Sequence, residues 1–499
     1  MLAALLAGYL LLSLLLLWDL TPVDDAFITF RYARNLVAGG GLSFNPSERV
    51  EGYSSLSWLL LMAAGEAIGL DLPGFSKALG LFFGLATLTL ISIGPFDAAS
   101  RLLTIGLLAL HLPWTYHAIN GLETVFVSFL VTALNLMPAS SRNLRSARHI
   151  FAITLVITRP EGLGLVIIIA VAVLLADRTR FSRHHLAICA SALAAFATQT
   201  AWRWFYHGDW IANSARAKLM PMSIALPRGL EDLGHFAFYA GAYGVVPLLA
   251  ATGVVLALRR RRDPGSGHVV ALLAFCLLAG LSLAASGGDS FALWRFFVPI
   301  APVSILCAAR GLHLLLRHGW HIARVASWAV LALALVHSAN SHIPKIRAGV
   351  PWGEQWKDIG MTLAKSVPPE TRIALSMVGI IPYYSELYTV DLLGLNDRVI
   401  ARRPPDPRYY GPGHQRHDGP YVLGLQPDLL ILAAGSVVSD PYAPFPWDSV
   451  RIYERDIITD PRFASNYRLI RIRLLSGKYL QVFASTRFLA RYRSDQGGS

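Results

Sequence analysis

The chain has 499 residues, of which 54% are hydrophobic and 15% charged, and its mean hydropathy is +0.47. These values exclude an ordinary water-soluble protein, and apolar runs near the length of a membrane span recur through the first two thirds of the chain, which predicts a polytopic membrane protein. The formal charge of +13 does not favour nucleic-acid binding, because many arginines lie in short clusters between apolar segments, where they orient helices.

The chain begins with an apolar segment at residues 2–18, which we interpret as a retained first span. A cleaved signal peptide would carry a basic start and a small-residue cleavage site, and neither precedes Asp24. A helix is predicted from Asp24 up to the glycines that begin at Gly39. The apolar stretch 54–70 is short and contains Glu66, so we expect a helix in the outer membrane interface.

Further spans are predicted at 76–94, 101–115, 123–138, 149–158 with a short extension, 160–176, 186–205, 235–257, 268–286, 295–316 and 323–339, which makes eleven with the first. Pro160 joins two of them with almost no loop, so 149–176 could also be one broken helix. Basic clusters at Arg142–Arg148, Arg178–Arg183, Arg259–Arg262 and Arg317–Arg324 are assigned to the cytoplasm. Counting 54–70 as a span would turn all of them outward.

After residue 339 the hydropathy falls, which divides the chain into a transmembrane domain, 1–339, and a soluble α/β domain outside the cytoplasm, 340–499. Short apolar runs between 371 and 400 and at 427–435 predict buried strands that alternate with helices or turns. Residues 467–485 predict a hairpin around Ser476 and Gly477. The residues between 403 and 413 are rich in proline and glycine and predict a loop that covers a membrane-side cavity.

The predicted topology places several polar segments on the outer face: "WDLTPVDDAFITFRYARNL" (18–36), "AINGLET" (118–124), "TRPEG" (158–162), "YHGDWIANSARAKLM" (206–220) and "SGGDSFALWRFF" (286–297). Ionisable residues near a membrane usually face a cavity or a partner, so a shared site in the outer leaflet is expected. The adjacent acids Asp24 and Asp25 have two interpretations. One acid could cap the helix that follows, but a cap needs one carboxylate, and the pair favours a general base that faces a cavity.

Six segments of the chain, in order, carry a family resemblance. "DDAFITFRYARNL", followed by "GLSFNPSERVEGYSSLSW", resembles the first outer loop of the GT-C superfamily of membrane glycosyltransferases, and most closely the branch of the mycobacterial terminal arabinofuranosyltransferases. "GLET", "TRPEG", "GDWIANSARAKL", "GGDSFALWRFFVP" and "DLLGLNDRVIA" resemble segments of that branch in the same order. The fold class implied is a mainly α polytopic membrane protein with a C-terminal α/β domain.

The resemblance implies a sugar donor linked to polyprenyl phosphate and an aspartate of the first outer loop as catalytic base. Asp24 and Asp25 match that position, and we narrowly favour Asp24, because at helical spacing it shares a face with Arg31. The chain departs from the family at "IANSARAKL" and at Ser290, which puts the sugar preference in doubt. Its C-terminal domain also resembles a smaller version of the mycobacterial one, which puts a long polysaccharide acceptor in doubt.

The chemistry of transfer requires further groups besides the base. A cation beside the lipid phosphate stabilises its departure, and the candidates are Arg295, Lys218, Arg159 and Arg31. Each has a structural alternative, such as an ion pair of Arg295 with Asp289 or a solvated surface position for Lys218. Candidates for contacts with the sugar or the acceptor are Glu123, Glu161, Asp209, Trp210 and Asp289. Glu123 could equally cap its helix, and Trp210 could anchor the chain in the membrane interface.

The sequence therefore predicts an inverting glycosyltransferase of the bacterial inner membrane, with its site facing the periplasm. It would move arabinofuranose, or another polyprenyl-phosphate-linked sugar such as mannose or glucose, to a glycan, glycolipid or protein acceptor. No cofactor or metal is expected, because no Gly-rich phosphate loop or set of metal ligands is recognisable. The alternatives are a transporter or flippase for lipid-linked sugars, which would favour internal repeats, and a catalytically silent sugar-binding relative.

Overall fold

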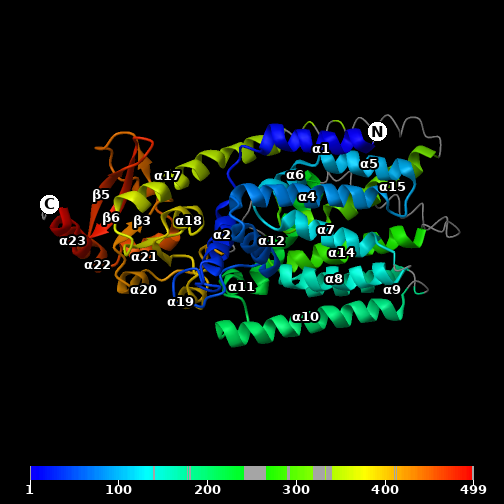
Figure 1. The fold of residues 1–499 in the computed structure, drawn as a ribbon, viewed down its shortest axis with the longest axis horizontal. Helices are drawn as coiled ribbons and strands as arrows, with labels where there is room; N and C mark the ends of the chain where they lie inside the picture. Colours follow the sequence, from blue (N-terminus) through cyan, green and yellow to red (C-terminus); the bar gives the residue numbers. More distant parts are fainter. Residues whose placement is uncertain are drawn as a thin grey trace.

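The structure is a computed structural model that describes residues 2–138, 141–176, 178, 181–240, 266–288, 293–317, 332, 336, 340–409, 411 and 413–496. Figure 1 shows an elongated molecule with a bundle of helices at one end and a smaller α/β part at the other. The helix α2 (Asp24–Val37) lies where the two parts meet. This arrangement confirms the predicted fold class, a mainly helical protein whose chain ends in a small sheet.

The helices of the bundle are α1 (Leu2–Leu17), α3 (Leu56–Ala67), α4 (Leu72–Ser92), α5 (Ala98–Ala109), α6 (Leu112–Ile119), α7 (Thr124–Leu136), α8 (Arg142–Thr158), α9 (Gly162–Ala176), α10 (Arg183–His207), α14 (Ser266–Ala285) and α15 (Ala301–Arg317), with a 3-10 turn, η2 (Val298–Ile300). Two described helices, Leu72–Ser92 and Gly267–Ala285, are each long and apolar enough to cross a membrane, and the bent pair α5 and α6 would add a third. The predicted eleven spans are not confirmed, and 323–339 and much of 235–257 fall outside the described residues.

The helices differ from the predicted spans in two places. The expected span 101–115 is replaced by α5 and α6, which meet at an angle of 62°. Pro113 lies in the first turn of α6, where it cannot continue a preceding helix, and the His111 side chain caps this turn by accepting the Trp114 N–H at 3.2 Å. The helix expected from 149 begins at Arg142, so Arg142 and Arg145 lie on α8 and not in a loop.

The segment between α10 and α14 contains two helices that the sequence did not predict, α11 (Asn213–Lys218) and α12 (Met222–His235), the latter continued by a π-helical turn, η1 (Phe236–Ala240). Gly229 allows α12 to approach α14 closely, since a Cβ there would lie 1.8 Å from the carbonyl oxygen of Ala284. These two helices lead the chain along the junction between the bundle and the α/β part.

The α/β part begins with α17 (Val350–Ser366) and contains one six-stranded sheet. The strands are β1 (Arg372–Leu375), β2 (Tyr388–Asp391), β3 (Leu429–Ile431), β4 (Val437–Val438), β5 (Tyr467–Arg473) and β6 (Tyr479–Ser485). β1 pairs in parallel with β2 and β3, whereas β6 is antiparallel to β3, β4 and β5. The predicted hairpin is confirmed, with Tyr467 opposite Ser485 and Gly477 in the left-handed region at φ +84°.

Short helices fill the connections of this part: α18 (Ile380–Ser385), α19 (Arg398–Ala401), α20 (Gly419–Gly424), η3 (Trp447–Ser449), α21 (Ile452–Ile458), α22 (Pro461–Asn466) and α23 (Thr486–Gln496). Separate apolar clusters cover the sheet, one including Phe483 and the other Ile359 and Leu480. A further cluster joins the two parts of the molecule, because Ile28 and Tyr32 of α2 share it with Val378 and Leu395. Apolar packing therefore fixes α2 against the α/β part.

Candidate active site

A cavity of about 610 Å³ lies at the junction of the helical and α/β parts. Its polar wall on the helical side is formed by four residues, Asp24, Asp25, Lys218 and Arg228. The α/β part supplies the remaining lining: Trp352, Trp356, Ser376, Met377, Val378, Leu393, Leu395, Tyr409, Gly411, Gly413, His414, Ala434, Arg451 and Tyr453. The cavity thus brings the paired acids, three cations (Lys218, Arg228 and Arg451) and several aromatic rings together from segments far apart in the sequence.

Asp24 is held by the start of α18 and does not cap its own helix. The N-cap of α2 is Val23, without a side-chain cap, whereas the two carboxylate oxygens of Asp24 accept the N–H groups of Gly379 at 3.0 Å and Ile380 at 2.7 Å. Gly379 permits this contact, since a Cβ there would lie 1.8 Å from the Asp24 carbonyl oxygen. The interpretation of this acid as a cap of its own helix is therefore wrong, and the helix that it caps is remote in sequence.

The surroundings of Asp24 alter its acidity. Burial raises the pKa of Asp24 to about 7, and the charge of Asp25 adds to this effect, although the two backbone hydrogen bonds oppose it. A carboxylate with a pKa near the working pH is a stronger proton acceptor than an ordinary aspartate and is still ionised in a large fraction of molecules. The two N–H groups also fix the orientation of the carboxylate toward the cavity.

Asp25 lies beside a cation of the same cavity. Its Oδ2 is 3.7 Å from the Nζ of Lys218, and about a quarter of each side chain is exposed. A pair at this distance and exposure contributes little to stability. The pair places a positive charge next to the paired acids.

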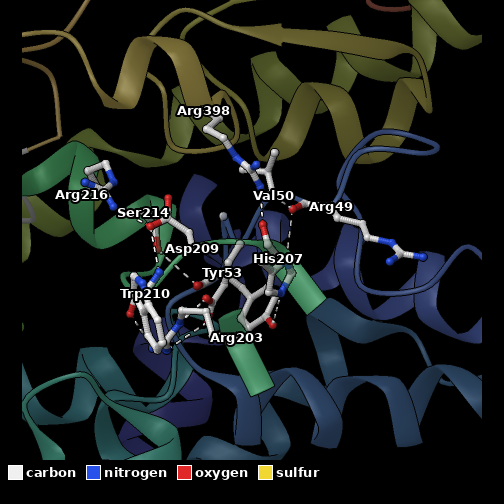
Figure 2. Close-up of polar contacts among 12 residues, drawn as sticks. Arg49, Val50, Tyr53, Arg203, His207, Asp209, Trp210, Ser214, Arg216 and Arg398 are labelled. Atoms are coloured by element: carbon white, nitrogen blue, oxygen red, sulfur yellow. Dashed lines mark hydrogen bonds and ion pairs between the residues drawn. The ribbon is translucent and has the colours of Figure 1, made fainter. Parts of the chain in front are cut away.

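Lys218 is positioned through the segment "GDWIANSARAKL", which a network of polar contacts holds in place (Figure 2). Arg203 of α10 pairs with Glu51, whose backbone carbonyl accepts the Ser214 N–H at 3.2 Å. Asp209 accepts hydrogen bonds from Arg216 at 2.6 Å and from Arg402 at 2.8 Å. These contacts fix α11 against both the first outer loop and α19.

The segment "DLLGLND" forms another part of the cavity wall, and Asp391 organises it. The buried carboxylate of Asp391 accepts the N–H groups of Leu393 at 2.8 Å, Gly394 at 3.1 Å and Asn396 at 2.6 Å. Burial raises the pKa of Asp391 to about 6, against the effect of these hydrogen bonds. Asn213 of α11 donates to the carbonyl of Gly394 at 2.8 Å, so the loop is also tied to the helix that carries Lys218.

Of the residues predicted for the site, the described part of the cavity wall contains Asp24, Asp25 and Lys218. Arg31 is buried, and its guanidinium donates to the carbonyls of Phe44, Pro382 and Leu387 at 2.8–2.9 Å. Among the described residues, Arg31 makes no hydrogen bond or ion pair with Asp24. The backbone N–H groups of Gly379 and Ile380 orient that acid instead.

Other predicted residues form a separate buried cluster. Arg159 directly follows α8, and its guanidinium forms ion pairs with two carboxylates, each at 2.7 Å. These belong to Glu123, which precedes α7, and to Glu161, which precedes α9. The guanidinium of Arg159 and that of Arg295 each lie over the ring of Phe296, at 5.1 and 5.3 Å from its centroid. None of these residues lines the cavity, and this arrangement joins helix ends within the bundle.

Two further candidates, Asp209 and Trp210, also lie outside the cavity wall. Asp209 belongs to the contacts around α11, and Trp210 is 55% exposed and stacks on Trp204 with ring centroids 4.5 Å apart. An exposed pair of indole rings fits an interfacial anchor better than an enclosed sugar site. The residues Asp289 and Ser290 lie outside the described residues.

The sequence did not indicate several residues of the cavity. Arg228 lies on an unpredicted helix, and within the described residues it makes no hydrogen bond or ion pair. The rings of Tyr409, His414 and Tyr453 pack together in T-shaped and tilted contacts, with centroids 6.0–6.4 Å apart. The expected cover of the cavity by residues 403–413 is confirmed, because Tyr409, Gly411 and Gly413 line it. A proline- and glycine-rich stretch was the signal for this loop, but nothing in the sequence pointed to α12.

Histidines do not complete a metal site in the described ranges, where no group of three His, Cys, Asp or Glu side chains could hold an ion. His417 instead hydrogen-bonds Asp456 at 3.1 Å and Asp406 at 3.2 Å. These bonds raise the pKa of His417 and connect the loop over the cavity to α21.

Comparison with known proteins identifies solved structures with a similar fold and a relative that matches a short part of the chain. A family model described as a domain of unknown function (DUF8728) matches residues 345–492. The terminal β-(1→2)-arabinofuranosyltransferase of Mycobacterium tuberculosis (strain ATCC 25618 / H37Rv) is 37% identical over 73 residues, which span 14% of this chain and 12% of that protein. The match therefore covers a small part of the relative.

Solved structures resemble nearly the whole chain. The structure of ArnT from Cupriavidus metallidurans bound to undecaprenyl phosphate has a TM-score of 0.56 at 14% identity, over 96% of this chain and 97% of ArnT. The Archaeoglobus fulgidus oligosaccharyltransferase in complex with Zn and sulfate has a TM-score of 0.50 at 14% identity, over 78% of this chain and 62% of that one. These likenesses show that the chain shares the fold of ArnT and of the archaeal oligosaccharyltransferase, which agrees with the fold predicted from the sequence.

Proposed function

We propose that the protein is a multi-pass membrane glycosyltransferase that moves a sugar from a polyprenyl-phosphate donor to a hydroxyl group of an acceptor. The observation that carries the proposal is the cavity in which Asp24 and Asp25 meet Lys218 and Arg228. The likeness to ArnT bound to undecaprenyl phosphate supports a lipid-linked donor. Transfer then requires a base for the acceptor hydroxyl and a cation for the lipid phosphate, and the cavity contains both kinds of group.

Asp24 is the proposed base. The acceptor oxygen attacks the anomeric carbon as its proton passes to the Asp24 carboxylate, and the bond from the anomeric carbon to the phosphate oxygen breaks. The raised pKa of Asp24, about 7, supports this role, because a proton acceptor works best when its pKa is near the working pH. Asp25 then holds Lys218, a division of labour that the sequence left open.

Lys218 and Arg228 are the proposed partners of the donor phosphate. Arg228 is a half-buried cation in the cavity wall, and within the described chain no carboxylate neutralises it. The lipid phosphate leaves with a negative charge, which two cations in a partly dry cavity stabilise. Lys218 lies on α11 and Arg228 on α12. In this proposal, Arg31, Arg159 and Arg295 have structural roles.

A single displacement by the acceptor inverts the anomeric configuration and needs no covalent intermediate. Arabinofuranose is the proposed sugar, supported by the partial likeness to the mycobacterial arabinofuranosyltransferase, and mannose or glucose are the alternatives. We also propose that the protein lies in a bacterial inner membrane, with the site and residues 340–499 on the periplasmic face. The proposed boundary between its two domains is near residue 339. A flippase for lipid-linked sugars is the competing class, and it would move the donor without breaking the bond between sugar and phosphate.

The donor can be identified with purified protein and a panel of polyprenyl-phosphate sugars that carry arabinofuranose, mannose or glucose. Release of free polyprenyl phosphate in the presence of a mixed glycan acceptor should be fastest with arabinofuranose. Faster release with mannose or glucose would transfer the assignment to that sugar. Release from none of them, with protein that remains folded and monodisperse, would refute the proposed function.

A further inference from the structure

A second cavity, of about 570 Å³, lies between α17, β4 and the turn that joins β5 to β6. Its lining is Pro351, Glu354, Gln355, Lys357, Asp358, Met361, Val437, Leu474, Leu475, Ser476 and Lys478, and none of these residues lines the first cavity. α17 is a wall of both cavities, since Trp352 and Trp356 face the first, while Glu354, Gln355 and Asp358 face the second. A single helix therefore separates the two.

The lining of the second cavity fits a neutral, polyhydroxylated ligand. Glu354 and Asp358 balance Lys357 and Lys478, so the site has no excess charge to attract a phosphate or a cation. Sugars need side-chain donors and acceptors around their hydroxyl groups together with apolar surface for their C–H faces. The apolar part is supplied by Pro351, Met361, Val437, Leu474 and Leu475.

Several polar groups of this cavity retain hydrogen-bonding capacity. The Asp358 carboxylate accepts two long contacts, from Thr362 Oγ1 and from the Ser476 N–H, both at 3.4 Å. The side-chain nitrogen of Gln355 donates to the Gly435 carbonyl at 2.9 Å, which leaves its oxygen available as an acceptor. The ammonium group of Lys478 makes no hydrogen bond or ion pair with any residue that the structure describes. A ligand could use all three groups without breaking a strong internal contact.

An exposed indole lies along the route between the cavities. Trp352 lines the first cavity, precedes Glu354 by half a turn and is 45% exposed. An exposed tryptophan offers a flat apolar face on which a sugar ring can stack. We propose that the second cavity binds the distal sugars of a neutral oligosaccharide acceptor, which crosses α17 at Trp352 and places its terminal hydroxyl in the first cavity. This inference rests on the proposed function and specifies the acceptor as a glycan of several residues.

The test compares a short with a long acceptor. The full-length enzyme in lipid nanodiscs receives polyprenyl-phosphate arabinofuranose and either a linear arabinofuranosyl disaccharide or the matching octasaccharide. Wild-type kcat/KM should be about tenfold higher for the octasaccharide, since a few added hydrogen bonds correspond to that factor. Asp358→Ala combined with Lys478→Ala should remove this advantage through KM and leave the disaccharide unchanged. Trp352→Ala should also raise KM for the octasaccharide.

Matched controls are Lys365→Ala, on the same helix, and Glu370→Ala, both exposed and outside the two cavities, which should behave as wild type. Equal kcat/KM for both acceptors in the wild type, or an equal loss for both in the double variant, would overturn the inference. Calorimetric binding of the octasaccharide without donor, weakened about tenfold or more by the double variant, is expected as well. Absence of transfer to any acceptor would refute the proposed function, and the calorimetry would still decide whether the second cavity binds glycan.

Discussion

Replacement of Asp24 by Asn separates the two tasks that the structure gives this residue. Its carboxylate accepts two backbone N–H groups at the start of α18, and in the proposed mechanism it also takes the acceptor proton. Asn retains one side-chain oxygen, so one of the two N–H groups would lose its partner at a cost of about 1–2 kcal/mol in the free energy of unfolding. The proton acceptor would be lost completely, and transfer should fall at least about 100-fold.

The assay measures transfer, donor binding and thermal unfolding for the same preparations. We expect Asp24→Asn to remain folded, to bind donor lipid and to transfer no more than about 1% of the wild-type amount per unit time. Asp25→Asn is the matched control, because it removes a neighbouring carboxylate without touching α18, and it should reduce transfer less. Transfer close to wild type by folded Asp24→Asn would refute the assignment, and a larger loss in Asp25→Asn would move the base to Asp25.

The remaining predictions concern charge and pH. kcat/KM should rise as the pH increases through about 7, because Asp24 must be ionised to accept a proton, and a profile already flat above pH 5 would contradict this. Arg228→Ala should lower transfer about 30- to 1000-fold in folded protein, while exposed Arg487→Ala should not, as measured with saturating acceptor. Arg31→Ala should lower the free energy of unfolding by more than about 3 kcal/mol, because several carbonyls lose a charged donor, and a stable variant with a purely catalytic defect would restore Arg31 to the site. The pKa of His417 is raised, so its contribution to stability is complete below pH 6.5 and is lost as the pH rises through that raised pKa. The melting temperatures of wild type and His417→Gln should therefore converge at higher pH. A difference that persists there would contradict the prediction.

The fold was predictable where the pattern was local and strong. Hydrophobic runs indicated the long helices, and Ser476 and Gly477 indicated the turn of the hairpin in which Tyr467 lies opposite Ser485. The break at Pro113 was missed because the apolar run continues across it, so hydropathy alone cannot reveal the change of direction. α12 was missed because its mixed composition resembles a polar loop, and its position depends on a long-range contact of Gly229 with Ala284.

The candidate site was predictable in part. Asp24, Asp25 and Lys218 stand in segments that the sequence singled out, and the cavity contains all three. The partner of Asp24 could not be predicted, since Gly379 is 355 residues away and acts through its backbone. Helical spacing suggested Arg31 instead, but a shared face does not decide where a long side chain ends, and tertiary packing directs this one to three backbone carbonyls.

The central claim, that the cavity transfers a sugar and does not translocate an intact lipid, can be tested with a donor labelled separately in its sugar and in its lipid. The protein is reconstituted into vesicles with this polyprenyl-phosphate arabinofuranose and a glycan acceptor, and both labels are followed over time. The account predicts that the sugar label passes to the glycan at the rate at which labelled polyprenyl phosphate appears, and that Asp24→Asn stops both. Movement of both labels across the vesicle membrane on one molecule, at equal rates in wild type and Asp24→Asn, would contradict it.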